Sequence, residues 1–198
     1  CVYCGSGLGR DPAHEAAARE LGQALGENGV ELVYGGGGNG LMGTVARSVL
    51  DAGGHVAGII PGFLVKREAM LESVQDHIVV DDMHTRKRMM FERADAFVAL
   101  PGGIGTLEEL VEQLTWAQLG QHHKPILIAN IGGYWDPLLA MFEHMTAHTF
   151  IRPSLTVPYL VAERVADILP MMEDAAAGVL AAGEPLKRTA SGTPVDKM

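Results

Sequence analysis

The sequence predicts an α/β protein with a Rossmann-like, doubly wound and mostly parallel sheet that carries helices on both faces. Short apolar runs alternate along the chain with longer segments of helical spacing, which is the strand–helix order of such folds. The runs are apolar throughout rather than at every second position, as expected for strands that are buried on both faces. Ligands of these folds bind at the carboxyl ends of the strands, so functional residues are expected there.

The first half of the chain contains four predicted strands with helices between them. Asp11 and Pro12 start the first helix, because Asp caps a helix well and Pro fits its first turn, and Gly29 ends it. The predicted strands are residues 1–5, 30–34, 55–60 and 77–80, and the predicted helices are 11–28, 41–52 and 81–94.

The second half continues the same alternation. Its predicted strands are residues 96–100, 125–130 and 157–161, and its predicted helices are 106–119, 135–148 and 163–177. We expect one Rossmann-like domain over residues 1–177. Residues 178–198 are rich in Ala, Gly, Pro and polar residues, which predicts a disordered or loosely docked tail.

Composition excludes several classes of partner. The formal net charge is −9, so a nonspecific grip on nucleic acid or on an anionic membrane is not expected. The most apolar run, Val56 to Val65, is far shorter than the roughly 20 residues that a membrane span needs. The two cysteines, Cys1 and Cys4, fall in a predicted strand and are interpreted as core residues, which favours a cytoplasmic protein.

Two glycine-rich stretches each follow a strand and precede a helix, an arrangement that favours phosphate binding. The first, Gly38 to Gly43, matches G-x-G-x-x-G. A dinucleotide site expects an acid at the end of the next strand, which here reads Ile59-Ile60-Pro61-Gly62, and a P-loop expects a lysine before Thr44. Neither requirement is met, so the sequence argues against both sites.

The second stretch, Pro101 to Thr106, allows two interpretations. Thr106-Leu107-Glu108-Glu109 fits the S/T-x-x-E capping box, in which Glu109 would only help to start the helix. Alternatively, the loop holds phosphate and Glu109 performs chemistry beside it.

Arg86 is the second unusual feature. At helical spacing it shares an apolar stripe with Met83 and Met90, and a buried guanidinium needs a partner. That partner could be an acid within the fold, the side chain could reach solvent at the edge of the stripe, or it could point into the cleft toward phosphate or base. The run Arg86-Lys87-Arg88 in an acidic chain favours an anionic ligand.

No metal or organic cofactor is predicted. His122 and His123 are adjacent in a loop without flanking acids and are interpreted as solvated. A pyridoxal phosphate enzyme needs a Schiff-base lysine, and no lysine of the chain lies in a recognisable motif for that cofactor.

Several motifs in the right order resemble those of one known family. PGGIGTLEE (101–109) is similar to the P-G-G-x-G-T-x-x-E signature of the LONELY GUY (LOG) family, and the likeness spans about residues 1–170. The other matching motifs are YGGGGNGLMG (34–43), GIIPGFLVKRE (58–68), MHTRK (83–87) and TWAQLG (115–120).

The resemblance implies a cytokinin-activating phosphoribohydrolase, a type often mislabelled lysine decarboxylase. Its substrate would be AMP with an N6 substituent such as isopentenyl, and its products would be the free base and ribose 5-phosphate. Arg86 and Glu109 match the family's catalytic residues. Nucleotide contacts are implied at Glu68, Arg86, Lys87, Gly102, Gly103, Ile104, Gly105, Thr106, Leu107, Glu108, Glu109 and Thr115. A homodimer is also implied.

The chemistry agrees with these assignments. Cleavage of an N-glycoside builds positive charge on the ribose. A nearby carboxylate can stabilise that charge, form a covalent adduct with the sugar, or activate water. A different hypothesis is a non-catalytic carrier of nucleotide or molybdenum cofactor, since such carriers share the fold and a similar glycine loop. Arg86 together with Glu109 favours the enzyme.

Overall fold

The computed structural model describes residues 1–66, 68–152 and 157–181. Within these ranges seven strands lie in the centre of the molecule, and every hydrogen-bonded pair among them is parallel. The strands are β1 (Val2–Tyr3), β2 (Leu32–Tyr34), β3 (Val56–Pro61), β4 (Asp76–Val80), β5 (Phe97–Ala99), β6 (Ile126–Ala129) and β7 (Leu160–Ala162). The predicted α/β class is therefore confirmed.

The strands form two hydrogen-bonded ladders, β1-β5-β6-β7 and β2-β3-β4, and β1 lies against β2. The spatial order is β4-β3-β2-β1-β5-β6-β7. The chain moves outward from β1 to β4 and then returns to place β5 on the other side of β1. This reversal between β1 and β5 is the topological switch point, where folds of this class bind ligands.

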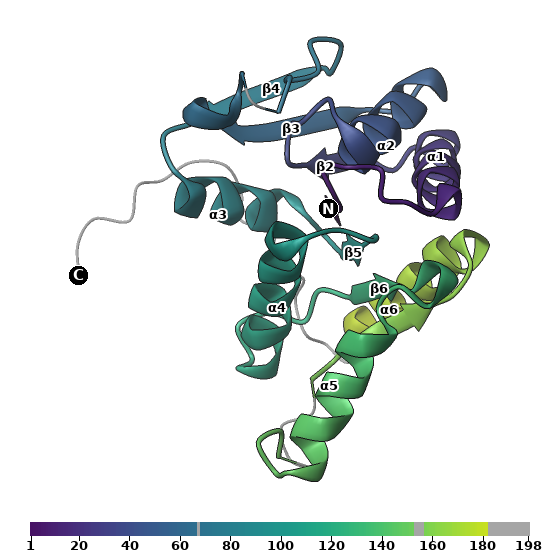
Figure 1. The fold of residues 1–198 in the computed structure, drawn as a ribbon, viewed down its shortest axis with the longest axis vertical. Helices are drawn as coiled ribbons and strands as arrows, with labels where there is room; N and C mark the ends of the chain where they lie inside the picture. The colour runs from purple at the N-terminus through teal and green to yellow at the C-terminus, as the bar shows by residue number, and fades with distance from the viewer. Residues whose placement is uncertain (67, 153–156, 182–198) are drawn as a thin grey trace.

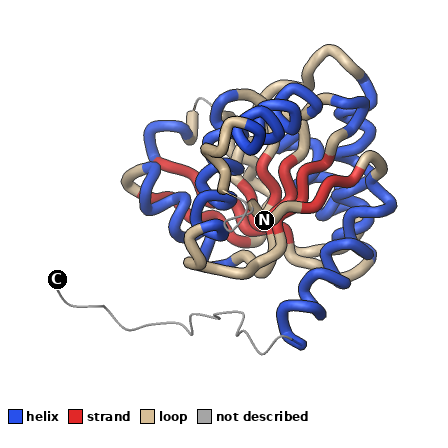
Figure 2. Tube along the Cα trace, turned by 90° about the horizontal axis from the view of Figure 1, so that it is seen from below, coloured by secondary structure: helices blue, strands red, loops and turns tan. Residues whose placement is uncertain are grey.

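Helices cover both faces of the strand layer (Figures 1 and 2). One face carries α1 (Pro12–Glu27), α2 (Gly40–Asp51) and α6 (Ile168–Ala181), and the other carries α3 (Met83–Arg93), α4 (Ile104–Gln118) and α5 (Asp136–Ala147). Short 3-10 turns at Gly62–Leu64, Ile131–Gly133 and Val165–Asp167 complete the described elements.

Strand residues alternate between two cores. Val2 and Cys4 pack in the core beneath α1, α2 and α6, whereas Tyr3 packs beneath α3 and α4. In β6, Ile126 and Ile128 enter that second core and the residues between and after them enter the first. Because side chains of a strand point alternately to opposite faces, an apolar run is what this two-sided burial requires.

The predicted elements are found with small shifts at their ends. Asp11 caps α1 by accepting a hydrogen bond from the N–H of Ala13, as its sequence predicts. The last helix continues past residue 177 to Ala181, so residues 178–181 of the expected tail are helical. The remainder of that tail, 182–198, lies outside the described residues. No helix within the described part of the chain is long and apolar enough to cross a membrane.

Candidate active site

A cavity of about 340 Å³ opens at the switch point between β1 and β5. Its glycine-rich walls come from the loop after β1, from Gly35 after β2, and from the loop that precedes α4. Met42, Leu64 and Met83 supply apolar side chains. Glu68, Arg86, Thr106 and Glu109 supply polar ones. A ligand in this cavity would meet both apolar surface and charged groups.

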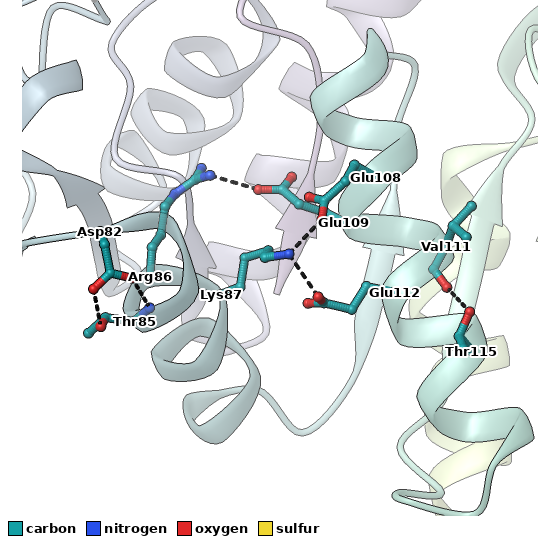
Figure 3. Close-up of polar contacts among 9 residues, drawn as sticks. All are labelled: Asp82, Thr85, Arg86, Lys87, Glu108, Glu109, Val111, Glu112 and Thr115. Atoms are coloured by element: carbon teal, nitrogen blue, oxygen red, sulfur yellow. Dashed lines mark hydrogen bonds and ion pairs between the residues drawn. The ribbon is translucent and has the colours of Figure 1, made fainter.

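Arg86 and Glu109 form an ion pair inside the cavity (Figure 3). Nη1 of Arg86 donates a hydrogen bond of 2.9 Å to Oε1 of Glu109, and its Nε donates one of 3.1 Å to the carbonyl oxygen of Ile59. Only 8% of Arg86 and 7% of Glu109 is exposed to solvent. The sequence left open whether Arg86 pairs with an internal acid or faces the cleft, and the structure shows that it does both.

Glycine at position 35 makes room for this guanidinium. A Cβ atom at Gly35 would overlap Nη2 of Arg86 and would lie 3.1 Å from Sδ of Met42. Any larger residue would therefore force Arg86 out of its place, so Gly35 helps to fix the position of the charge.

Burial raises the pKa of the Glu109 carboxyl above its ordinary value of 4.5, and the nearby Arg86 guanidinium acts in the opposite direction. The result is a carboxylate that accepts a proton more readily than an exposed glutamate does. Such a group is suited to take a proton from water.

The N-terminus of α4 faces the same cavity and is uncapped by any side chain. Its cap residue is Gly103, and the helix begins at Ile104, so Thr106 lies inside the helix. The capping-box interpretation of Thr106 is therefore wrong, and the carboxylate of Glu109 bonds to Arg86 instead. The first N–H groups of a helix have no acceptor within it, so they are available to an anion here.

The first glycine stretch has a different role. The N–H of Gly38 donates to the carbonyl oxygens of Glu68 and Ala69, at 2.9 and 3.0 Å. The N–H groups of Leu41 and Met42 donate to the carbonyl oxygens of Gly7 and Gly5, at 3.4 and 3.3 Å. These three amides already have acceptors and are not free to hold an anion, and Met42 of this stretch lines the cavity.

Lys87 links α3 to α4 (Figure 3). Its Nζ lies 2.5 Å from Oε1 of Glu108 and 2.7 Å from Oε2 of Glu112. Burial acts to lower the pKa of Lys87, but hydrogen bonds with the two glutamates raise it overall. These contacts hold the helices of Arg86 and Glu109 together beside the cavity.

The other residues implied by the family resemblance divide into two groups. Glu68, Gly103, Ile104, Gly105 and Thr106 line the cavity. Gly102 lines an adjoining cavity, Leu107 packs against the core, and Glu108 lies beside Lys87. Thr115 is exposed and its hydroxyl donates to the carbonyl oxygen of Val111 at 2.7 Å, so the structure does not bring it to the cavity.

Sequence reasoning missed several lining residues, namely Cys4, Gly5, Ser6, Gly35 and Leu64. The signal that could have found the first four is their position directly after β1 and β2, because the carboxyl ends of parallel strands meet at one edge. Leu64 enters through a turn after β3 that no periodic pattern indicates.

The prediction for His122 is wrong. Its side chain is buried, Nε2 lies 3.2 Å from the carbonyl oxygen of Gln113, and Nδ1 accepts from the N–H of Lys124. Burial lowers the pKa of this imidazole. His122 is thus a structural residue of the loop before β6, whereas His123 is exposed as expected.

Comparison with known proteins identifies the family. A family model described as "Possible lysine decarboxylase" matches residues 42–172. A probable cytokinin riboside 5′-monophosphate phosphoribohydrolase of Oryza sativa subsp. japonica, LOGL5, is 45% identical over 174 residues, which are 88% of this chain and 71% of the relative. The chain belongs to this LOG family. The Arabidopsis thaliana enzyme LOG7 is 44% identical over 88% of this chain and 80% of its own length.

Solved structures support the fold of this LOG family member. The Moco carrier protein from Chlamydomonas reinhardtii superposes with a TM-score of 0.66, covering 89% of this chain and 96% of the carrier. The molybdenum cofactor binding protein of Rippkaea orientalis gives a TM-score of 0.65 over 87% and 94% of the two chains. Their sequence identities of 22% and 21% establish a shared architecture and no shared ligand.

Proposed function

We propose that this LOG family member cleaves the N-glycosidic bond of an adenosine 5′-monophosphate, plain or N6-substituted, to the free base and ribose 5-phosphate. The observation that carries the proposal is the buried Arg86–Glu109 pair in a cavity that also receives the uncapped N-terminus of α4. The names of the relatives, riboside 5′-monophosphate phosphoribohydrolases, agree with it.

The site can bind the phosphate and leave the sugar beside the carboxylate. Amides at the start of α4 and the Thr106 hydroxyl hold the 5′-phosphate, because the helix dipole and free N–H groups favour an anion. Glu109 follows on the same helix, so its carboxylate meets the ribose. The family resemblance implies a set of residues that contact the nucleotide. We assign to the ligand those members of the set that line this cavity or the adjoining one.

In the reaction, the bond between C1′ and the base nitrogen breaks and its electron pair leaves with the base. Positive charge then develops on C1′ and the ring oxygen, and the Glu109 carboxylate stabilises it. Water adds to C1′ and gives up a proton to Glu109. The departing base anion takes up a proton from the protonated Glu109 or from solvent, which gives the neutral base and ribose 5-phosphate and restores the carboxylate. The Arg86 guanidinium stabilises negative charge on the departing base or on the phosphate, and it is too weak an acid to donate a proton.

Met42, Leu64 and Met83 are the apolar side chains that could receive the base and its substituent. Glu68 lines the same cavity, and in this proposal its carboxylate accepts a hydrogen bond from the exocyclic amine of the base. The implied roles of four residues as nucleotide contacts stay predictions of the family resemblance, since none of them lines this cavity or its neighbour: Lys87, Leu107, Glu108 and Thr115.

The lysine decarboxylase description of the family model does not fit this cavity. Pyridoxal phosphate would need a lysine to form a Schiff base, and no lysine is present among the described residues that line the cavity.

A product assay tests the proposal. The purified protein is incubated with AMP, GMP, CMP or isopentenyl-AMP, and base and ribose 5-phosphate are separated by chromatography. Release of adenine or isopentenyladenine is expected. Nucleotide that binds without any release of base would contradict the enzyme and favour the carrier hypothesis.

We further propose a homodimer, as the family resemblance implies. Apolar side chains that a partner could cover are exposed on α4, at Val111, and on α5, at Met141 and Met145. Light scattering with size-exclusion chromatography measures the mass.

Both cysteines are free, which fits the predicted cytoplasmic location, and fractionation of cells would test it.

A further inference from the structure

Tyr134 reaches the loop before α4 from a distant part of the chain. Its hydroxyl donates a hydrogen bond of 2.5 Å to the carbonyl oxygen of Gly102, from which 32 positions separate it. Gly102 directly precedes Gly103, the cap residue of α4, where the proposed function places the 5′-phosphate. Since Gly102 follows β5 and Tyr134 follows β6, the bond joins the loops at the carboxyl ends of two neighbouring strands.

The loop that carries Tyr134 is held by contacts of its own. The side-chain amide of Asn130 donates a hydrogen bond of 2.7 Å to Oδ1 of Asp136, and its oxygen accepts one of 2.7 Å from the N–H of Trp135. Gly133 has a φ of +73°, and a Cβ atom there would lie 2.6 Å from Oδ2 of Asp136. The loop therefore presents Tyr134 from a fixed backbone.

The ring of Tyr134 is packed although 41% of the residue is exposed. It meets the ring of Trp135 edge-on at 5.0 Å and the ring of His14 edge-on at 5.2 Å, measured between ring centroids. These contacts do not involve the hydroxyl. A phenylalanine at this position would thus keep the packing and lose only the hydrogen bond to Gly102.

The hydrogen bond fixes the orientation of one peptide unit. The carbonyl of Gly102 and the N–H of Gly103 belong to the same trans peptide, so they point in opposite directions. Gly103 lines the active-site cavity, whereas Tyr134 and Gly102 line only the adjoining cavity of about 290 Å³. With the carbonyl held at Tyr134, the N–H of Gly103 points away from it, and no acceptor for this N–H is found among the described residues.

The same loop is confined on its other side. The N–H of Gly5 donates a hydrogen bond of 3.1 Å to the carbonyl oxygen of Pro101. A Cβ atom at Gly102 would overlap the side chain of Thr106 and lie 2.9 Å from the nitrogen of Gly5. The loop after β1 and the loop after β6 therefore hold the Gly102 peptide between them.

We propose that Tyr134 is a positioning residue for the substrate phosphate, because it orients the peptide between Gly102 and Gly103 so that the N–H of Gly103 donates to the 5′-phosphate. A hydrogen bond to the carbonyl also polarises the peptide, which strengthens its N–H as a donor. Tyr134 acts through the loop and does not touch the substrate. The inference rests on the proposed function, which places the phosphate at the start of α4.

The test compares two probes of which only one carries a phosphate. Calorimetry measures, in separate titrations, the binding of ribose 5-phosphate and of adenine. Tyr134→Phe should weaken ribose 5-phosphate by about three- to tenfold, the scale of one hydrogen bond, and should leave the affinity for adenine unchanged. KM for AMP should rise by a similar factor while kcat changes little, because the phosphate is bound equally before and during the reaction.

Two further variants separate this role from a structural one. Tyr159→Phe removes the hydroxyl of a ring that packs against Phe142 and lines neither cavity, so it should keep all affinities. Gly133→Ala should displace Tyr134 and reproduce the selective loss, and combining it with Tyr134→Phe should add little further loss.

The outcomes are distinct. An unchanged affinity for ribose 5-phosphate in Tyr134→Phe, or an equal loss for both probes, would overturn the inference alone. Additive losses in the double variant would overturn it as well, because Gly133 would then not act through Tyr134. An unaltered protein that binds neither ribose 5-phosphate nor AMP would overturn the proposed function with it.

Discussion

Nη1 of Arg86 lies 2.9 Å from Oε1 of Glu109, although 23 positions separate the two residues in the chain. The pair joins α3 to α4 (Figure 3), and both residues are buried. Each charge compensates the other, because an unpaired charge at such burial would be very costly. The pair can therefore hold opposite charges ready for a nucleotide.

Glu109→Gln should lower turnover of AMP by about a thousandfold or more, because the amide cannot stabilise the charged sugar or accept a proton from water. Binding of a carbocyclic analogue of AMP, which lacks the ring oxygen and cannot lose its base by this route, should persist. Glu143→Gln, at an exposed position of α5, is the matched control and should keep full activity. Unchanged turnover in Glu109→Gln would remove Glu109 from the chemistry.

The turnover number should fall in acid at a higher pH than an ordinary glutamate would produce. Burial raises the pKa of Glu109 above 4.5, so as the pH falls this carboxylate is protonated earlier and its stabilising charge is lost. The measurement is kcat against pH at saturating AMP, which reports groups in the bound complex. An acid limb centred at or below pH 4.5 would contradict the assignment.

Gly35→Ala should reduce turnover by about tenfold or more while the protein stays folded, because the new methyl group occupies the place of the Arg86 guanidinium. Gly178→Ala is the control, since a Cβ there meets no atom within 4 Å. Thermal unfolding distinguishes a displaced side chain from a lost fold. Equal activity of the two variants would show that the position of Arg86 is not critical.

The phosphate of the substrate should matter greatly. Adenosine should be cleaved with a kcat/KM about a hundredfold or more below that of AMP, because charge-assisted hydrogen bonds at the start of α4 are lost. Gly102→Ala places a methyl group against the side chain of Thr106 and should weaken AMP turnover but not adenosine turnover. An equal loss for both substrates would argue against a phosphate cradle at this loop.

Lys87→Met should lower the free energy of unfolding by about 1–3 kcal/mol, since it leaves the carboxylates of Glu108 and Glu112 without their cation. A double-mutant cycle with Glu112→Gln should be non-additive. If Lys87 instead contacts the nucleotide, KM for AMP rises sharply while stability hardly changes. Chemical denaturation and steady-state kinetics together decide between these roles.

Much of the fold could be predicted because its determinants are local. Parallel strands that are buried on both faces need apolar residues at every position, so they appear in the sequence as continuous apolar runs. Asp11, directly before Pro12, starts α1 by accepting a hydrogen bond from a residue only two positions away. Local reasoning also allowed a capping box at Thr106, which the structure excludes, and it wrongly predicted a solvated His122. In the first case the Glu109 carboxylate accepts a hydrogen bond from Arg86 on another helix. In the second case the His122 ring lies within hydrogen-bond distance of the backbone carbonyl of Gln113.

The sequence by itself determined the strand–helix order, the glycines at the ligand edge, and the membership of Arg86 and Glu109 in one set of motifs. Only the tertiary structure decided that these two side chains pair, that Lys87 binds two glutamates, and that amides of the first glycine stretch bond to carbonyl oxygens of other loops. The reason is physical. Periodicity and caps depend on neighbours within a few residues, whereas these contacts depend on how α3, α4 and the loops pack across the end of the sheet.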